Sequence, residues 1–334
     1  MDFTEFKSRF QREQVEEYPN EVDPKPLVSI LVLTYNHVAF LPQCLDSILG
    51  QKVNFKLEIL LADDESVDGT QEICLQYAKK YPGLIRFFQH KKINNIQINK
   101  LDTGIFNALY SLYQAKGEYI AYCDGDDLWG DKTKIHRQVN FLQQNPDYIL
   151  SYHPVIYFND QSSLPIKNKN ILNKDLSSEE LKKVIQQPLL NTVCFRNNMK
   201  NYPAEITTIL NSDNFLISLL GHFGKGKYLE SIKPSTYRIH SGGIWSMISK
   251  EKKFLSKIQS LKTIAHYYGQ NNQKELSKYF TTEVYMYQKS LIFINWKNKT
   301  YIKMLKNLLD YSIYSIANSP ILLDLKPYLS RKMQ

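Results

Sequence analysis

Short apolar runs separated by amphipathic segments restrict the fold more than any other feature of the chain. The runs are nearly continuous, as in strands buried on both faces of a parallel sheet, and do not alternate with polar residues. They predict strands at 27–33, 57–62, 84–88 and 119–123, with helical spacing in the segments between them. Strands that alternate with helices in this way favour an α/β fold with a doubly wound, mostly parallel sheet flanked by helices.

The pattern changes twice along the chain of 334 residues, so we expect three regions. Residues 1–26 are charged and end in Asp23-Pro24-Lys25-Pro26, which predicts an N-terminal lead-in without regular structure. Residues 27–248 would form the α/β domain. Residues 249–334 are rich in tyrosine and lysine and predict a helical C-terminal region.

The net charge of +9 indicates an anionic partner or a basic surface. The excess lysines are scattered, as on a solvated surface, so we expect no nucleic-acid partner.

The four cysteines are far apart without a CxxC pair, which predicts buried reduced thiols. The N-terminal residues are polar and no run of 18 apolar residues occurs. We therefore expect a cytoplasmic protein, with peripheral contact at the inner face of the cell membrane as an open alternative.

Polar and acidic clusters follow three of the predicted strands. They are Thr34-Tyr35-Asn36, Asp63-Asp64-Glu65-Ser66 and Asp124-Gly125-Asp126-Asp127. Ligands of open parallel sheets bind outside the carboxyl ends of the strands, so these clusters should converge on one site. Three carboxylates within four residues repel one another unless a cation lies among them, and Mg²⁺ or Mn²⁺ prefers oxygen ligands. The alternatives are a solvated acidic turn for the last cluster and ordinary turn or cap residues for the second.

Taken together, these segments resemble the family 2 glycosyltransferases of GT-A fold, of the bacterial surface-polysaccharide type. Pro26 to Asn36 is similar to the family pattern PxVSVIxxTYN, Asp63 to Thr70 to VDDGSxDGT, and Asp124 to Asp126 to its DxD. A weaker resemblance continues at Asp213, where serine precedes the aspartate in place of the family's usual glutamate. Residues 237–246 are similar to the segment YRxHxGGxxS.

The resemblance implies a GT-A fold and the transfer of a sugar from a nucleotide-sugar donor, by default a UDP-sugar. The acceptor would be a hydroxyl of a glycan or lipid-linked glycan, and the reaction an inverting displacement that depends on Mn²⁺ or Mg²⁺. Residues 27–150 would bind the donor and residues 151–248 the acceptor.

Individual roles also follow from the resemblance. The residues that it implies for donor binding are Thr34, Tyr35, Asn36, Asp64, Lys100, Asp124 and Arg238. Asp126 would bind the metal, with His240 as a second protein ligand. Asp213 would be the general base, and its alternative is a helix cap. The alternative for His240 is an ordinary buried polar residue.

The sequence argues against two other enzyme classes and leaves one non-catalytic class open. A sugar-1-phosphate nucleotidyltransferase would carry a glycine- and arginine-rich loop where residues 34–37 lie, and a dinucleotide-dependent oxidoreductase would need GxGxxG there. A non-catalytic nucleotide-sugar-binding or scaffold protein that has kept the fold remains an alternative.

In the C-terminal region, apolar residues repeat at helical spacing among lysines, which predicts either a surface helix that contacts a membrane or a face packed on the rest of the protein. These residues are Ile302, Leu305, Leu308 and Leu309. The oligomeric state is not predicted.

Overall fold

The chain folds into two compact units, which are described separately. The computed structural model describes residues 1–159, 164–166, 172–243 and 248–317. The first unit takes in residues 1–207 and 212–246, and the second takes in 208–211 and 247–334. Three predictions extend beyond the described residues: the end of the 237–246 segment, part of the acceptor half and the last residues of the C-terminal region.

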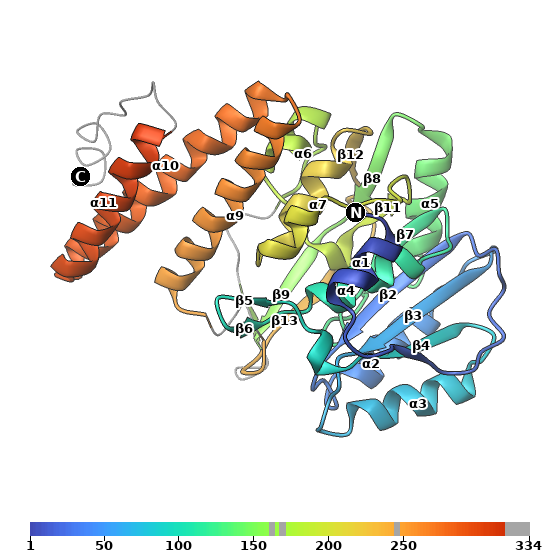
Figure 1. Cartoon of the computed structure of the whole chain (residues 1–334). Helices are drawn as coiled ribbons and strands as arrows, with labels where there is room; N and C mark the ends of the chain where they lie inside the picture. The colour runs from blue at the N-terminus through green and yellow to red at the C-terminus, as the bar shows by residue number, and fades with distance from the viewer. Residues whose placement is uncertain (160–163, 167–171, 244–247, 318–334) are drawn as a thin grey trace. The chain divides into compact units, whose positions relative to one another are not determined.

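An eight-stranded sheet organises the first unit (Figure 1), in the order β1-β4-β3-β2-β7-β11-β8-β12. Its strands are β1 (Glu16–Glu17), β2 (Val28–Thr34), β3 (Leu57–Asp63), β4 (Ile85–Gln89), β7 (Tyr119–Tyr122), β8 (Tyr148–Tyr152), β11 (Cys194–Arg196) and β12 (Lys225–Tyr228). The four central strands β4, β3, β2 and β7 run parallel, and β11 lies antiparallel between β7 and β8. The predicted mostly parallel α/β sheet is confirmed.

Helices cover both faces of the parallel strands, because these strands are apolar on both faces. Three helices share a buried core with one face: α2 (Leu41–Leu49), α3 (Thr70–Lys80) and α5 (Lys134–Gln144). On the other face, α4 (Ile105–Gln114) contacts β2 and β3, and α1 (Phe3–Phe10) lies beside α4 (Figure 1). All four cysteines are buried free thiols, as predicted.

The N-terminal residues are more ordered than predicted. Residues 3–10 form α1 (Phe3–Phe10), and β1 pairs with β4 at the edge of the sheet. Phe6 is fully buried and stacks on Phe106 of α4, with the ring centroids 5.1 Å apart. The predicted lack of regular structure is therefore wrong for these residues, because burial of Phe6 fixes the helix. No helix or strand occurs from residue 18 to 27, the segment that includes Pro24 and Pro26.

A second, three-stranded sheet lies in the later half of the first unit, in the order β10-β9-β13. Its strands are β9 (Val155–Asn159), β10 (Leu164–Ile166) and β13 (Ser235–Ile239). Thr236 of β13 forms a bridge with Leu128, two hydrogen bonds that tie β13 to the acidic cluster after β7. The remaining short elements of this unit are β5 (Gln97–Ile98), β6 (Leu101–Asp102), α6 (Ser178–Lys183), α7 (Ser212–Leu220) and the 3₁₀ turns η1 (Lys92–Asn94), η2 (Leu190–Thr192) and η3 (Ala204–Thr208).

Three helices make up the second unit: α9 (Lys250–Gln270), α10 (Lys274–Lys297) and α11 (Tyr301–Ala317). Leu308 of α11 packs against a core that contains Tyr285 and Ile292 of α10. Ile302, Leu305 and Leu309 point away from this core and are 85%, 61% and 61% exposed. The apolar stripe predicted in this region is thus split between a packed and an exposed face. None of the helices described here combines the length and hydropathy needed to cross a bilayer.

Candidate active site

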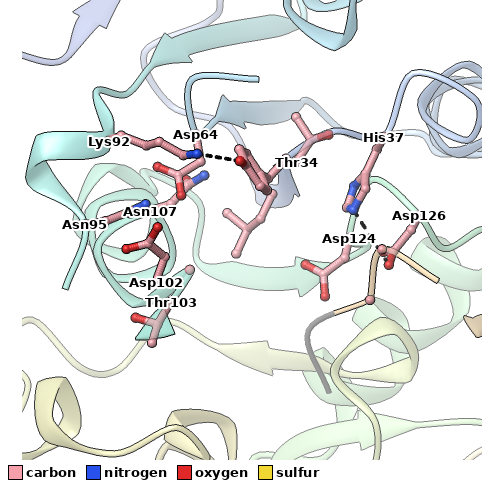
Figure 2. A pocket seen from close by; sticks show the side chains of 15 residues that line it. Thr34, His37, Asp64, Lys92, Asn95, Asp102, Thr103, Asn107, Asp124 and Asp126 are labelled. Carbon is pink, nitrogen blue, oxygen red and sulfur yellow. Dashed lines mark hydrogen bonds and ion pairs between the residues drawn. The ribbon is translucent and has the colours of Figure 1, made fainter. Parts of the chain in front are cut away.

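A pocket of about 350 Å³ opens at the carboxyl ends of β2, β3 and β7. The sequence placed its polar clusters at these ends, and the structure brings five of the predicted residues to the pocket wall. They are Thr34, Tyr35, Asp64, Asp124 and Asp126. Figure 2 shows Asp64 at one end of the pocket, Asp124 and Asp126 at the other, and Thr34 between them.

The loop after β2 is held in place by the loop after β3. The backbone N–H of His37 donates to Thr70 Oγ1 at 2.8 Å, and that of Val38 donates to Asp68 Oδ2 at 3.1 Å. Asn36 takes a left-handed conformation with φ 54°, and its side-chain oxygen accepts from the Val67 N–H. Asn36, predicted to bind the donor, is not among the pocket-lining residues and acts here as a link between the two loops.

Oxygen atoms without hydrogen-bond partners collect at the Asp64 end of the pocket. Oδ1 of Asp64, Oδ1 of Asn95 and Oδ1 of Asn107 are buried and accept no hydrogen bond within the described structure. Burial raises the pKa of Asp64 to about 6 from its ordinary value of 3.8, although the nearby Asn95 amide acts in the opposite direction. Buried polar atoms are rarely left unpaired, so these three acceptors mark a place for a ligand that carries N–H or O–H groups.

A positively charged side chain, Lys92, also lines the Asp64 end of the pocket, and the sequence analysis did not predict it. Lys92 Nζ donates to the Tyr35 hydroxyl at 2.5 Å, as the dashed line at Lys92 marks in Figure 2, and lies 4.7 Å from the centroid of that ring. Lys100, predicted to bind the donor, lies in the turn between β5 and β6, is exposed, and is not among the pocket-lining residues. Lys92 follows the end of β4 by three residues, and this position at a strand end could have indicated that it lies at the site.

Carboxylates crowd the opposite end. Burial and the neighbouring carboxylates of Asp126 and Asp213 raise the pKa of Asp124 to about 7. Burial, together with Asp126 and Asp124, also raises the pKa of Asp127 well above its ordinary value, and Asp127 Oδ1 accepts from the Arg238 backbone N–H. Burial would raise the pKa of Asp126 too, but the hydrogen bond from His240 and the charge of His37 hold it below the ordinary value.

Two imidazole rings face Asp126. His240 follows β13, and its Nε2 lies 3.0 Å from Asp126 Oδ2. His240 Nδ1 accepts from the Gly242 N–H at 3.2 Å, so the ring proton lies on Nε2 and is donated to the carboxylate. His37 Nε2 lies 3.8 Å from the same oxygen, and the dashed line beside His37 in Figure 2 marks this pair. His37 was not predicted; no local pattern distinguishes it.

Arg238 supports this end from outside the pocket. Its Nε donates to the Asp126 carbonyl at 2.9 Å, and its Nη2 donates to Gln43 Oε1 at 2.9 Å. The guanidinium also lies over the Phe40 ring, 4.9 Å from the centroid. Arg238, predicted to bind the donor, is not among the pocket-lining residues and positions the Asp126 backbone.

Asp213 lies in the first turn of α7. Its Oδ2 accepts from Gln187 Nε2 at 2.6 Å, and its charge contributes to the raised pKa of Asp124. The bond to Gln187 is a tertiary contact and not a helix cap, because a capping carboxylate accepts from a first-turn N–H. Asp213 is thus an acidic group near the carboxylate end of the pocket without lining it.

The residues at the carboxylate end fit a divalent cation. One ligand atom from each of His37, Asp126 and His240 lies within 4.8 Å of the others. Asp126 stays ionised, and the repulsion among Asp124, Asp126 and Asp127 is what a bound cation relieves. Asp126 and His240 would hold such a cation, and His240 would then carry its ring proton on Nδ1, the atom that accepts from the Gly242 N–H here.

Comparisons with known proteins identify the family of the chain. The family model described as "Glycosyl transferase family 2" matches residues 29–200. Uncharacterized protein Rv1520 of Mycobacterium tuberculosis is 29% identical over 233 residues, which cover 68% of this chain and 63% of that protein. Minor teichoic acid biosynthesis protein GgaB of Bacillus subtilis is 26% identical over 66% of this chain and 24% of its own length. Mannosyltransferase PcManGT from Pyrobaculum calidifontis, solved with GDP-Man and Mn²⁺, gives a TM-score of 0.49 at 13% identity over 94% of this chain and 93% of its own.

Proposed function

The chain belongs to glycosyl transferase family 2, and on this premise we propose that it transfers a sugar from a nucleotide-sugar donor to a hydroxyl of a glycan or glycolipid. The observation that carries the proposal is one pocket with two unlike ends. Unpaired oxygen acceptors lie at the Asp64 end, and a carboxylate–imidazole cluster lies at the Asp126 end. A nucleoside diphosphate has matching ends, a base with N–H donors and a diphosphate that binds with a divalent cation.

The donor is a UDP-sugar in this proposal. Uracil has one N–H group and the ribose has two hydroxyls, and the acceptor oxygens of Asp64, Asn95 and Asn107 are available to such donors. The Tyr35 ring lies beside the base, Thr34 lines the middle of the pocket, and Asp124 accepts from the ribose. Lys92 donates to the Tyr35 hydroxyl and so holds that ring at the base end of the pocket.

At the other end, Asp126 and His240 hold the metal, which is Mn²⁺ or Mg²⁺. The bound cation supplies Lewis-acid stabilisation of the departing diphosphate. Gly242 lines the pocket, and its backbone N–H would donate to a phosphate oxygen. Arg238 fixes the Asp126 backbone through its bond to the carbonyl, so the carboxylate keeps its direction.

Asp213 is the general base of the proposed reaction. It takes the proton from the acceptor hydroxyl as that oxygen attacks the anomeric carbon, while the bond to the diphosphate breaks. Gln187 holds the carboxylate by donating to Oδ2. A single base with no carboxylate nucleophile gives one displacement and inverts the anomeric centre, by the same logic as inverting glycoside hydrolysis.

The acceptor is a cell-surface glycan or its lipid-linked precursor. Residues 151–248 bind it, since Asp213 lies there. The teichoic acid biosynthesis function in the name of the GgaB relative supports a surface polymer, although the alignment covers only 24% of that protein.

An anionic membrane surface is the proposed contact of α11. Ile302, Leu305 and Leu309 form an exposed apolar stripe, and Lys299 and Lys306 are exposed near it. Apolar side chains with flanking lysines suit the interface of an anionic bilayer.

Vesicle sedimentation tests the membrane contact. We expect binding to phosphatidylglycerol vesicles but not to phosphatidylcholine vesicles, with at least tenfold weaker binding after Leu305→Ser and Leu309→Ser together. Leu255→Ser is the control, because Leu255 is 46% exposed on α9 and lies outside the stripe. Equal sedimentation of the double variant and the wild type contradicts the proposed contact.

Calorimetric titration of UDP, GDP, dTDP and CMP, each with Mn²⁺ and with EDTA, tests the donor site. We expect metal-dependent binding of one nucleotide by the wild type and by the control Asp147→Ala, whose side chain is exposed. Asp126→Ala should weaken this binding at least tenfold. If no nucleotide binds under either condition, the transferase proposal is contradicted and a non-catalytic protein with the same fold is favoured.

A further inference from the structure

We propose that His37 is a third protein ligand of the metal, so that two imidazole nitrogens and one carboxylate bind the cation and favour Mn²⁺ over Mg²⁺. The inference rests on the proposed function, in which Asp126 and His240 hold a divalent cation. It adds a ligand from the loop after β2, which is far in sequence from both.

The spacing of the three ligand atoms fits one ion. Metal–nitrogen and metal–oxygen bonds are about 2.1 Å long, so neighbouring ligands of an octahedral ion lie about 3 Å apart. His240 Nε2 and Asp126 Oδ2 already have this separation at 3.0 Å, and His37 Nε2 is 3.8 Å from the same oxygen. All three atoms lie within 4.8 Å of one another, so a shift of the His37 ring by about an ångström completes the set.

The hydrogen bonding of the His37 ring leaves Nε2 available to bind a metal ion. Its Nδ1 is buried without a hydrogen-bond partner within the described structure, and its Nε2 is too far from Asp126 for a hydrogen bond. The backbone N–H of His37 donates to the Thr70 hydroxyl at 2.8 Å, which holds the loop that carries the ring.

The glycine between the two aspartates of the acidic cluster makes room for this ring. A Cβ on Gly125 would lie 2.9 Å from His37 Nδ1 and 2.8 Å from Thr34 Oγ1, closer than real Cβ contacts. Any larger residue at position 125 therefore requires the imidazole or Thr34 to move. The close approach of the His37 ring is therefore one reason for a glycine at position 125, beside the turn that this residue forms.

The ligand types decide which ion is preferred. Mg²⁺ prefers oxygen ligands and near-ideal octahedral geometry, whereas imidazole nitrogen suits transition metals. Asp127, which could supply another oxygen, instead accepts from the Arg238 N–H. Two nitrogens against one oxygen therefore favour Mn²⁺, and the loss of one nitrogen should reduce that preference.

Pulsed EPR of bound Mn²⁺ counts the nitrogen ligands directly, without nucleotide and without turnover. The full chain is stripped with EDTA, loaded with Mn²⁺ and measured by electron spin-echo modulation from ¹⁴N. We expect two nitrogens in the wild type and in the control His266→Gln, whose side chain is exposed on α9. His37→Gln should show one nitrogen and bind Mn²⁺ at least tenfold more weakly, with Mg²⁺ affinity changed less than threefold.

Gly125→Ala provides a second route, because it keeps all three ligand side chains and displaces only the His37 ring and Thr34. It too should show one nitrogen while circular dichroism stays that of the wild type. One nitrogen in the wild type, or an unchanged spectrum in His37→Gln, overturns the role of His37 and leaves the proposed function intact. If the wild type binds no Mn²⁺, the inference fails together with metal dependence, and the nucleotide titration in EDTA then decides separately whether a donor site exists.

Discussion

Replacing Asp64 by asparagine should make the stability of the protein less dependent on pH. Burial raises the pKa of this carboxyl to about 6 from 3.8. Below about pH 3 the group is mostly protonated in both the folded and the unfolded chain and carries almost no penalty. As the pH rises, the unfolded chain loses the proton first, so the free energy of unfolding falls until the folded pKa is passed. The difference of about 2.2 pKa units corresponds to about 3 kcal/mol, reached near pH 7 and constant above it.

Urea denaturation of the wild type and Asp64→Asn from pH 4 to pH 7.5 measures this effect. Other carboxyls titrate in both proteins, so the difference between the two curves isolates Asp64. Because the unfolded carboxyl is already partly deprotonated at pH 4, we expect Asp64→Asn to gain about 2.4 kcal/mol relative to the wild type between these limits. Asp147→Asn, at an exposed site, is the control for a lost surface charge. A difference that stays within about 0.5 kcal/mol across the range would refute the buried, ligand-facing state of Asp64.

Three further changes test other parts of the molecule. Asp213→Asn should lower kcat by about 10²–10⁴-fold while calorimetry shows nucleotide affinity within twofold of the wild type; unchanged turnover would exclude it as the base. Arg86→Met should reduce the unfolding free energy in urea by about 3–5 kcal/mol, because it leaves fully buried Glu58 without its ion pair at 3.2 Å; a loss below about 1 kcal/mol would contradict this. Phe6→Ala should cost about 3–5 kcal/mol in the same assay, since Phe6 is fully buried against Phe106; a neutral result would mean that α1 contributes no packing.

The central sheet was predictable because its signals are local. Each parallel strand is an apolar run that is read from a few adjacent residues, and Asp64 and Asp124 come just after two of these runs. The convergence of strand ends then follows from the topology of parallel sheets. The family 2 resemblance of the three motifs is confirmed by the match over residues 29–200.

The features that were missed depend on partners distant in sequence. Phe3, Phe6 and Phe10 have helical spacing, but the burial that orders α1 comes from Phe106. His37 acquires its position from Thr70 and its neighbour Asp126 from the end of β7. Such contacts exist only in the folded chain, and a single sequence gives no measure of them.

The bridge between Leu128 and Thr236 also has a consequence for how the chain matures during synthesis. Asp126 and His240 are separated by 114 residues, and this bridge brings them together. A ribosome releases Asp126 long before β13 has emerged, so a nascent chain holds the acidic cluster without His240. A product truncated before β13 would therefore lack a ligand of the cluster even if β2, β3, β4 and β7 had already paired.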